Sequence, residues 1–241
     1  RGECPDLSNR AGDVFFLRRL DPEQAAKTVA ELCGRRLPRN MGIPPDQIQV
    51  LSPTRRYATG TAHLNRLLQE ALNPPETGKR ERAFGPYLFR EGDRVMQIRN
   101  NYDILWTRGD GSESGMGIFN GDIGKIISIS PGEAVVTVDF EGRVADYAED
   151  QLPELEPAYA MTVHKAQGSE YRAVVLVALE GASMLRTRSV LYTAITRAKE
   201  LLVIVGDEKV VSHMAENNLQ RRRYSGLRWR LASEQPPNET F

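Results

Sequence analysis

Two stretches of residues, A-Y-A-M-T-V-H-K-A-Q-G-S-E-Y (158–171) and V-L-Y-T-A-I-T-R-A-K (190–199), decide the fold of this chain. The first leads into the apolar run 173–179, and the second leads into the apolar run 201–205. Short runs that are almost wholly apolar are typical of strands buried on both faces of a parallel sheet. The small and apolar residues of 189–199 recur at helical spacing, which places a helix between the two strands. The pattern therefore predicts an α/β domain.

The N-terminal part of the chain shows the same alternation of strand and helix. An apolar run at 14–17 is followed by a helix start, with Asp21 at the N-cap, Pro22 at the first helical position and Gln24 three residues after the cap. The run 48–51 predicts a second strand. A second amphipathic helix follows it, with one apolar stripe made by Leu64, Leu67, Leu68 and Leu72.

The middle of the chain has a different character. The polar stretch 76–82 is typical of a linker, and it follows two prolines that end the second helix. Short strands separated by glycines then predict a small β-barrel, with strands expected at 94–99, 117–130, 134–140 and 143–148. The polar, glycine-rich segment 100–115 is expected to be a mobile loop. An all-β insertion thus interrupts the α/β domain.

Composition narrows the class of protein without identifying a partner. The 241 residues are 40% hydrophobic and 27% charged, with a formal net charge of zero, so any nucleic-acid surface must be a local patch. Cys4 and Cys33 lie far apart, which disfavours a disulfide framework and a zinc site, and we expect no metal site in this chain. No apolar run approaches the ~18 residues of a membrane span. The absence of an initiator Met or signal peptide suggests an interior piece of a longer cytoplasmic protein.

A phosphate-binding P-loop is missing from the sequence. The pairs Gly78-Lys79 and Gly124-Lys125 are the candidates, but neither has a glycine five positions earlier or a hydroxyl residue after the lysine. Asp139 ends a strand of the β insertion and is interpreted as structural. We therefore expect that the chain cannot hold nucleotide phosphates and Mg²⁺ unaided.

Four segments in register resemble one family. Residues 158–171 and 190–199 resemble motifs V and VI of superfamily 1 helicases. Their sequences, T-V-H-K-A-Q-G-S-E and L-Y-T-A-I-T-R-A-K, are most similar to the RecD-like branch. Residues 50–56, continuing to Leu64 and Asn65, resemble motif IV of that branch. The residues F-N-G-D-I-G at 119–124 resemble a signature of the SH3-like insertion that these helicases carry in their second motor domain. The resemblance spans nearly the whole chain in the expected order.

The resemblance implies the fold and the architecture. It implies a RecA-like second motor domain, the UvrD-like C-terminal domain, over 1–82 and 156–241, interrupted by an SH3-like β-barrel at 83–155. In such helicases, ATP lies in a cleft between this domain and a preceding motor domain that holds the P-loop and the Mg²⁺ ligands. The domains close and open as they move along single-stranded DNA, with 5′-to-3′ polarity in the RecD-like branch.

Arg197 is the expected catalytic residue. It lies in the predicted helix, and its permanently charged, fixed guanidinium suits a γ-phosphate. The alternative is a surface arginine extending from a helix. The resemblance of its surroundings to motif VI favours the role of arginine finger, an effect worth ~10³–10⁵ in phosphoryl transfer.

Three further residues are implied to bind the nucleotide. Gly168 permits close approach of the backbone, Glu170 is implied to bind a ribose hydroxyl, and Arg56 is a second phosphate ligand by its match to motif IV. The alternative for Glu170 is a solvated loop acid. Tyr57 and Ala58 stand where the family tends to have Gly and Pro, so the path of this loop is open.

Three residues are implied to contact single-stranded DNA. These are Thr162 and His164 in motif V, and Thr54, which lies at the end of a strand and suits a phosphate-backbone contact. A lone histidine is more commonly an ordinary packed or surface residue. Lys165 is expected to give electrostatic support.

The remaining expectations concern partners. We expect the chain to be part of a monomeric bacterial enzyme of DNA repair or recombination. Its expected partners are single-stranded DNA and the P-loop domain of its own polypeptide, and no membrane association is expected. The arginine-rich stretch 218–230 could bind nucleic acid through charge and stacking, but a terminal helix that docks one apolar face is favoured.

The resemblance also predicts that the chain alone hydrolyses no ATP and unwinds no DNA. Two other functions stay open at this point. One is a stand-alone module that binds single-stranded nucleic acid through the barrel. The other is the C-terminal region of a conjugative relaxase or helicase, which shares motifs V and VI.

Overall fold

The computed structural model describes residues 7–8, 12–130, 132, 135–179 and 185–218, so nearly all of the arginine-rich stretch lies outside the described residues. The helical segments are α1 (Pro22–Glu31), a π turn η1 (Leu32–Arg36), α2 (Leu37–Met41), η2 (Pro45–Gln47), α3 (Thr61–Leu72), η3 (Leu152–Glu154), α4 (Arg188–Ile195) and α5 (Glu208–Glu216). The strands are β1 (Val14–Arg18), β2 (Ile48–Ser52), β3 (Glu81–Phe84), β4 (Tyr87–Arg90), β5 (Arg94–Gln97), β6 (Asn101–Arg108), β7 (Ser114–Ile118), β8 (Ile123–Ser130), β9 (Val135–Phe140), β10 (Arg143–Tyr147), β11 (Leu155–Pro157), β12 (Ala160–Thr162), β13 (Tyr171–Ala178) and β14 (Ala198–Gly206).

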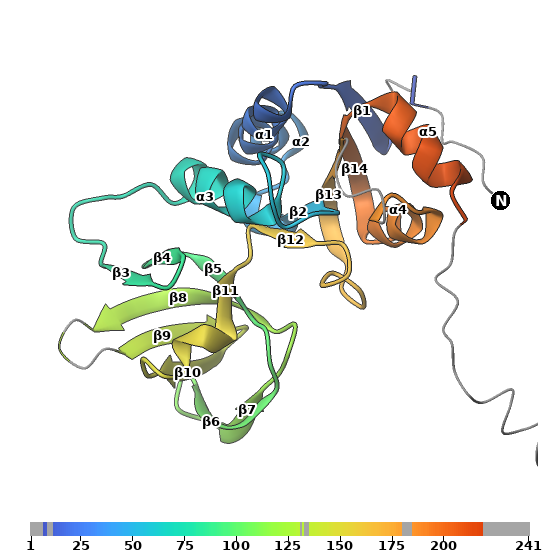
Figure 1. Cartoon of the computed structure of the whole chain (residues 1–241). Coiled ribbons are helices and arrows are strands. Elements are labelled where there is room, and N and C mark those ends of the chain that lie inside the picture. Colours follow the sequence, from blue (N-terminus) through green and yellow to red (C-terminus); the bar gives the residue numbers. More distant parts are fainter. Residues whose placement is uncertain (1–6, 9–11, 131, 133–134, 180–184, 219–241) are drawn as a thin grey trace, which may run out of the picture.

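A parallel five-stranded sheet in the order β1-β14-β13-β2-β12 organises the α/β part. Helices α1, α2 and α3 cover one face and α4 and α5 cover the other (Figure 1). The central strand β13 is almost wholly buried, and its neighbour β14 is buried from Leu201 onward, because side chains on both of their faces meet a helical layer. The predicted α/β domain of RecA-like type is confirmed.

Local chemistry explains where the helices begin. The Asp21 carboxylate accepts a hydrogen bond from the Gln24 amide at 2.8 Å, and Pro22 follows it at the first helical position, as the sequence predicts. Asp207 caps α5 in the same way, through the Lys209 amide at 3.0 Å. These caps fix the ends of helices whose apolar faces complete the two core layers.

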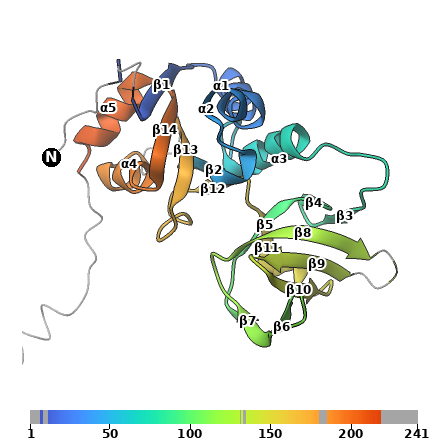
Figure 2. The same ribbon diagram turned by 180° about the vertical axis from the view of Figure 1, so that it is seen from behind.

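The inserted part is antiparallel and has its own core. Its seven-stranded sheet runs β11-β5-β8-β9-β10-β6-β7, and a hairpin of β3 and β4 lies beside it (Figure 2). The buried side chains of this barrel come from almost every strand, with Phe89, Ile118, Val138, Phe140 and Tyr147 at its centre. The predicted β insertion is confirmed as an SH3-like barrel.

The β6–β7 hairpin corrects one expectation. The segment 100–115 is not a loop, because residues 101–108 pair with residues 114–118. The predicted single strand 117–130 is likewise split by a turn between β7 and β8. Gly115 explains why a glycine-rich segment forms a strand: the Trp106 ring lies against it, and a Cβ there would be 2.5 Å from the ring.

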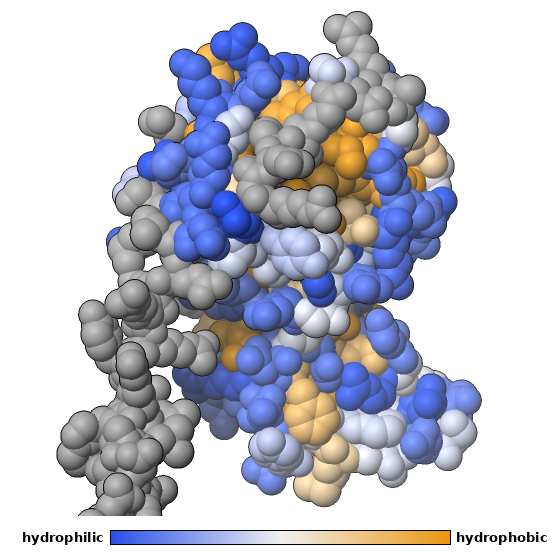
Figure 3. All heavy atoms as spheres, turned by 90° about the vertical axis from the view of Figure 1, so that its right-hand side faces the viewer, coloured by the Kyte–Doolittle hydropathy of each residue, from blue (hydrophilic) through white to orange (hydrophobic). Residues whose placement is uncertain are grey.

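Figure 3 shows apolar side chains protruding among hydrophilic ones at the lower end of the molecule, where this hairpin lies. The large exposed hydrophobic residues of the hairpin and its following turn are Tyr102, Leu105, Met116 and Phe119. The rings of Tyr102 and Phe119 meet edge to face, with centroids 5.6 Å apart.

A buried carboxylate joins the barrel to the α/β part. Asp93, 2% exposed, accepts hydrogen bonds from Gln69 of α3 at 2.5 Å, from Asn73, which follows that helix, at 2.7 Å, and from the Tyr159 hydroxyl at 3.0 Å. The Arg90 amide donates a further bond at 2.7 Å. Burial raises the pKa of Asp93, against the opposing effect of these donors. The carboxylate therefore ties together the two places where the chain crosses between the parts. We call Asp93 and the four residues that donate to it, Gln69, Asn73, Arg90 and Tyr159, the Asp93 hub.

Among the residues that the structure describes, no helix is long and apolar enough to cross a membrane. The same residues contain no group of three or more His, Cys, Asp or Glu side chains arranged to hold a metal ion.

Candidate functional site

Segments that lead into neighbouring parallel strands meet at one edge of the sheet. Glu170 directly precedes β13 and Arg197 directly precedes β14, and Tyr171 is paired with Ala198 in the register of these strands. The Tyr171 amide donates to the Arg197 carbonyl at 2.8 Å. The two segments that decide the fold therefore lie side by side at the N-terminal edge of the sheet.

Arg197 lies in the turn after α4 and not on the helix, which corrects the sequence prediction. Helix α4 ends at Ile195, because Ala198 already belongs to β14. The half-buried guanidinium donates from Nη1 to the Ser169 carbonyl at 2.9 Å and from Nε to the Thr193 carbonyl at 3.1 Å. Its Nη2 donates to the Thr196 hydroxyl at 3.1 Å. These bonds fix the plane of the guanidinium while leaving further N–H groups without a hydrogen bond to any described residue.

The neighbours of Arg197 at this edge are Gly168 and Glu170. Gly168 has a φ of 94°, and a Cβ there would meet no atom within 4 Å. Glycine is thus required for the backbone conformation and not to make space in the chain itself. The exposed Glu170 carboxylate lies 3.4 Å from the Lys199 Nζ. The structure brings three of the predicted nucleotide ligands together.

A groove of about 870 Å³ opens between this edge and the barrel. Glu170 lines it, together with Arg94 and with Arg143 of β10. The Arg94 guanidinium donates to the Asp46 and Ile48 carbonyls at 3.1 and 3.3 Å, and burial lowers its pKa. Both acidic and basic side chains line the groove, so its charge alone indicates no ligand.

The predicted DNA contacts lie at the opposite edge. Thr54 follows β2, while Thr162 ends β12 and His164 follows it, and these two strands are parallel neighbours with Thr162 paired to Ser52. The Val163 amide donates to the Ser52 carbonyl at 3.3 Å. Since the C-terminal ends of parallel strands share an edge, the three residues lie on one side of the sheet. His164 is exposed.

Arg56 belongs to this second edge. It lies four residues beyond the end of β2, and its amide donates to the Thr54 hydroxyl at 3.3 Å. The structure does not bring Arg56 close to Arg197. Arg56 follows the strand β2, whereas Arg197 precedes the strand β14, so the two lie at opposite edges of the sheet. The sequence prediction grouped the two because the match to motif IV carries no information about the direction of the sheet.

The loop between β2 and α3 is tightly wound. Tyr57 has a φ of 71°, in the left-handed region, at the position where the resemblance leads us to expect glycine. A Cβ on Gly60 would be only 2.2 Å from the Arg56 carbonyl oxygen, so glycine is required at position 60 for this close approach of the backbone.

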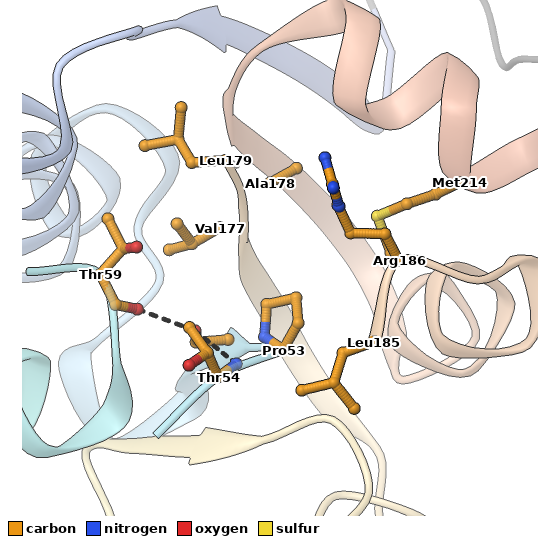
Figure 4. A pocket seen from close by; sticks show the side chains of 10 residues that line it. Pro53, Thr54, Thr59, Val177, Ala178, Leu179, Leu185, Arg186 and Met214 are labelled. Atoms are coloured by element: carbon orange, nitrogen blue, oxygen red, sulfur yellow. Dashed lines mark hydrogen bonds between the residues drawn. The ribbon is translucent and has the colours of Figure 1, made fainter. Parts of the chain in front are cut away.

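Two residues at this edge escaped the sequence analysis. Arg186 borders a cavity of about 10 Å³, room for one water, together with Thr54 and Met214 (Figure 4). Its Nε is buried and has no hydrogen-bond partner among the described residues. Glu156, on β11, accepts hydrogen bonds from both Arg55 and Lys165. No local pattern marks either residue, because each becomes notable only through contacts with distant segments.

Comparisons with known proteins agree with this architecture. Residues 64–140 match the ATP-dependent RecD-like DNA helicase SH3 domain, and residues 157–205 match the UvrD-like helicase C-terminal domain. The chain is 35% identical over 205 residues to the ATP-dependent RecD2 DNA helicase of Deinococcus radiodurans, which covers 85% of this chain and 25% of that protein. It is 33% identical over 186 residues to the RecBCD enzyme subunit RecD of Mycolicibacterium smegmatis, which covers 77% of this chain and 29% of that subunit.

Among solved structures, the Pif1 helicase from Bacteroides in complex with ADP-AlF3 and ssDNA matches 87% of this chain and 50% of that chain. The sequence identity is 17% and the TM-score is 0.46, too loose a fit for residue correspondences. The chain spans about a quarter of the length of the curated relatives described above.

Proposed function

Since this chain belongs to the RecD-like helicases and comprises their SH3 domain and UvrD-like C-terminal domain, we propose that it is the second motor domain of an ATP-dependent DNA helicase with 5′-to-3′ polarity. The domain limits proposed from the sequence are 1–82 with 156–241 for the motor domain and 83–155 for the barrel. The observation that supports the proposal best is the meeting of Arg197, Gly168 and Glu170 at one edge of the sheet.

We assign the nucleotide to the N-terminal edge. Arg197 contacts the γ-phosphate as it leaves, and its bonds to the Ser169 and Thr193 carbonyls orient it for this role. Glu170 binds the ribose, and the positive φ of Gly168 shapes the loop that carries it. The P-loop and the Mg²⁺ ligands come from a preceding motor domain of the same polypeptide. ATP therefore bridges two domains, and the chain by itself is inactive.

We assign single-stranded DNA to the C-terminal edge, where Thr54, Thr162 and His164 lie together. The place of Arg56 beside Thr54 favours a DNA phosphate over the nucleotide as its ligand. ATP closure and DNA contact thus act at opposite edges of the same parallel sheet, the first before β13 and β14 and the second after β2 and β12. A shift of this rigid sheet toward the P-loop domain would then move the DNA contacts with it. We expect the working enzyme to be a monomer.

The test uses Arg197→Lys and Arg197→Ala in the parent helicase. Turnover with saturating single-stranded DNA should fall by at least about 100-fold, because lysine cannot reproduce the planar donor set. DNA affinity should stay within about threefold, since Arg197 lies at the other edge. ATP hydrolysis and fluorescence anisotropy with a labelled oligonucleotide give the two measurements.

Arg188→Lys is the matched control. This arginine begins α4 and also donates to backbone carbonyls, of Ala215 at 2.7 Å and Glu216 at 3.2 Å, but it lies away from the nucleotide edge. If Arg188→Lys and Arg197→Lys lower turnover equally, or if Arg197→Lys leaves it unchanged, the finger role is wrong. Hydrolysis of ATP by the isolated chain, lost on Arg197→Ala, would contradict the composite site.

A further inference from the structure

One carboxylate is shared by two cations at the DNA-facing edge. Glu156 accepts from Arg55 Nη2 through Oε1 at 2.7 Å and from Lys165 Nζ through Oε2 at 2.5 Å. Arg55 lies in the loop after β2, Lys165 in the turn after β12, and Glu156 on the barrel strand β11. A single side chain thus connects the loop after β2 to the nearby segments β11 and the turn after β12, which lie about 100 residues further along the chain.

The cations face outward and the carboxylate faces inward. The side chains of Arg55 and Lys165 are 59% and 28% exposed, whereas that of Glu156 is 17% exposed. All three line a cavity of about 60 Å³ that Thr162 also lines. Thr162 is one of the proposed DNA contacts, so the two cations lie directly beside the proposed path of the strand.

We propose that Arg55 and Lys165 bind phosphates of single-stranded DNA, and that Glu156 is an internal counter-ion which these phosphates displace. The inference rests on the proposed function, because it takes the C-terminal edge as the DNA path. Carboxylate and phosphate offer the same kind of anionic oxygen to a guanidinium or an ammonium. Glu156 therefore holds the two cations in position when DNA is absent and competes with the DNA when it arrives.

The exposure of Arg55 makes this exchange feasible, because its side chain is 59% exposed and an ion pair that solvent reaches is weak. Lys165 is more covered, at 28%, but it keeps a solvent-facing side from which a phosphate can approach. Phosphate binding also releases counter-ions from the DNA, which favours the exchange at low salt. Strand release is the reverse step, in which Glu156 recaptures Arg55 and Lys165. Glu156 thus sets how readily the strand leaves this edge during each step of movement.

A purely structural role makes a different prediction. If Glu156 only fixes the barrel to the motor domain, removing its charge lowers stability and leaves DNA binding unchanged or weaker. The proposal predicts the opposite sign for binding. The experiment therefore measures the affinity of the whole chain for a fluorescent oligo-dT by anisotropy, at several salt concentrations, together with the thermal midpoint of each variant.

Glu156→Gln should raise the affinity for oligo-dT about 3- to 10-fold at low salt. It should also steepen the dependence of log affinity on log salt, because no freed carboxylate then takes up a cation from solution to offset those released from the DNA. Arg55→Gln/Lys165→Gln should weaken binding, and adding Glu156→Gln to that pair should give no gain. The gain thus depends on the two cations being present.

Glu200→Gln is the matched control for charge. Its carboxylate pairs with Arg172 at 2.7 Å in an exposed ion pair, so it changes the net charge equally without touching the cluster. Equal affinity gains in Glu156→Gln and Glu200→Gln, or no gain in Glu156→Gln, would overturn the inference. Binding of oligo-dT by the wild-type chain would in that case still support the proposed function. If the wild-type chain and its parent helicase both fail to bind oligo-dT, both proposals are wrong.

Discussion

Cys33 lies in the apolar core between α1 and the sheet, and this burial governs its ionisation. Burial raises the pKa of its thiol from the ordinary value of 9.0 to about 12. The unfolded chain therefore loses this proton first, and the thiol's contribution to stability is complete below pH 9 and is lost as the pH rises from 9 toward 12.

We expect the unfolding free energy of the wild-type chain to fall relative to Cys33→Ala by about 1 kcal/mol between pH 8 and pH 10. Urea denaturation of both proteins under reducing conditions gives this difference. The buried tyrosines titrate in both proteins and cancel. Parallel pH profiles would show that the thiol ionises as easily in the folded chain as in the unfolded one.

At this scale, the sequence predicted which candidate residues lie together at one edge of the sheet for some of them and missed it for others. Arg197, Gly168 and Glu170 meet as the motif resemblance implies, because short segments next to buried strands keep their relation to the sheet. The separation of Arg56 from them was missed because the prediction relied on the match to motif IV; Arg56 follows the strand β2, whereas Glu170 and Arg197 precede β13 and β14, which places them at opposite edges of a parallel sheet. The pairing of Glu156 with Lys165 had no local signal at all.

The loop between β2 and α3 carries a conformational cost at Tyr57. This side chain is 77% exposed, and its φ of 71° places an L-residue in the left-handed region. Tyr57→Gly should raise the unfolding free energy by up to about 1 kcal/mol, because glycine adopts this conformation without steric strain. Chemical denaturation measures the effect.

Tyr192→Gly is a suitable contrast to Tyr57→Gly. Tyr192 is also exposed, at 68%, but it lies within α4, where glycine should destabilise by about 1 kcal/mol. If both substitutions destabilise the chain, the loop is not strained at Tyr57. The opposite signs are what the two backbone conformations require.

Among the elements, those with a strong apolar period were predicted and those built from glycine and polar residues were not. The buried runs became β13 and β14, and the Asp21 cap began α1 where expected. The β6–β7 hairpin was missed because its pairing depends on Trp106 covering Gly115, a contact between separate strands. Helix α4 was predicted too long, since no glycine or proline marks its end before β14 begins at Ala198.

At the scale of the whole molecule, the Asp93 hub holds the barrel against the motor domain. Asp93→Ala leaves the buried donors of Gln69, Asn73 and Tyr159 without their acceptor. We expect a loss of about 3 kcal/mol in unfolding free energy and partial uncoupling of the two parts. Asp110→Ala, in the exposed tip of the β6–β7 hairpin, should change stability by less than about 0.5 kcal/mol.

Uncoupling is measured in a Trp229→Phe background, so that fluorescence reports Trp106 in the barrel while circular dichroism reports the helices of the α/β part. With Trp229→Phe alone, the urea transitions seen by fluorescence and by circular dichroism should coincide. When Asp93→Ala is added, the two transitions should separate. Coincident transitions in both would show that the hub contributes stability without coupling. The hub could not be foreseen from the sequence, because its members come from three separate segments.

The order of the strands in the sheet determines which part of the chain can fold first during synthesis. Among the described strands, β1 pairs with β14 alone, Val14 opposite Leu202, so the motor sheet stays open at one side until nearly all of the described chain has been made. The barrel strands, in contrast, are contiguous from β3 to β11 and need no later residue. The barrel can thus complete its core before the motor sheet does, while β1 still lacks its partner strand. Chaperone dependence should therefore centre on β1, the strand that waits longest for its partner.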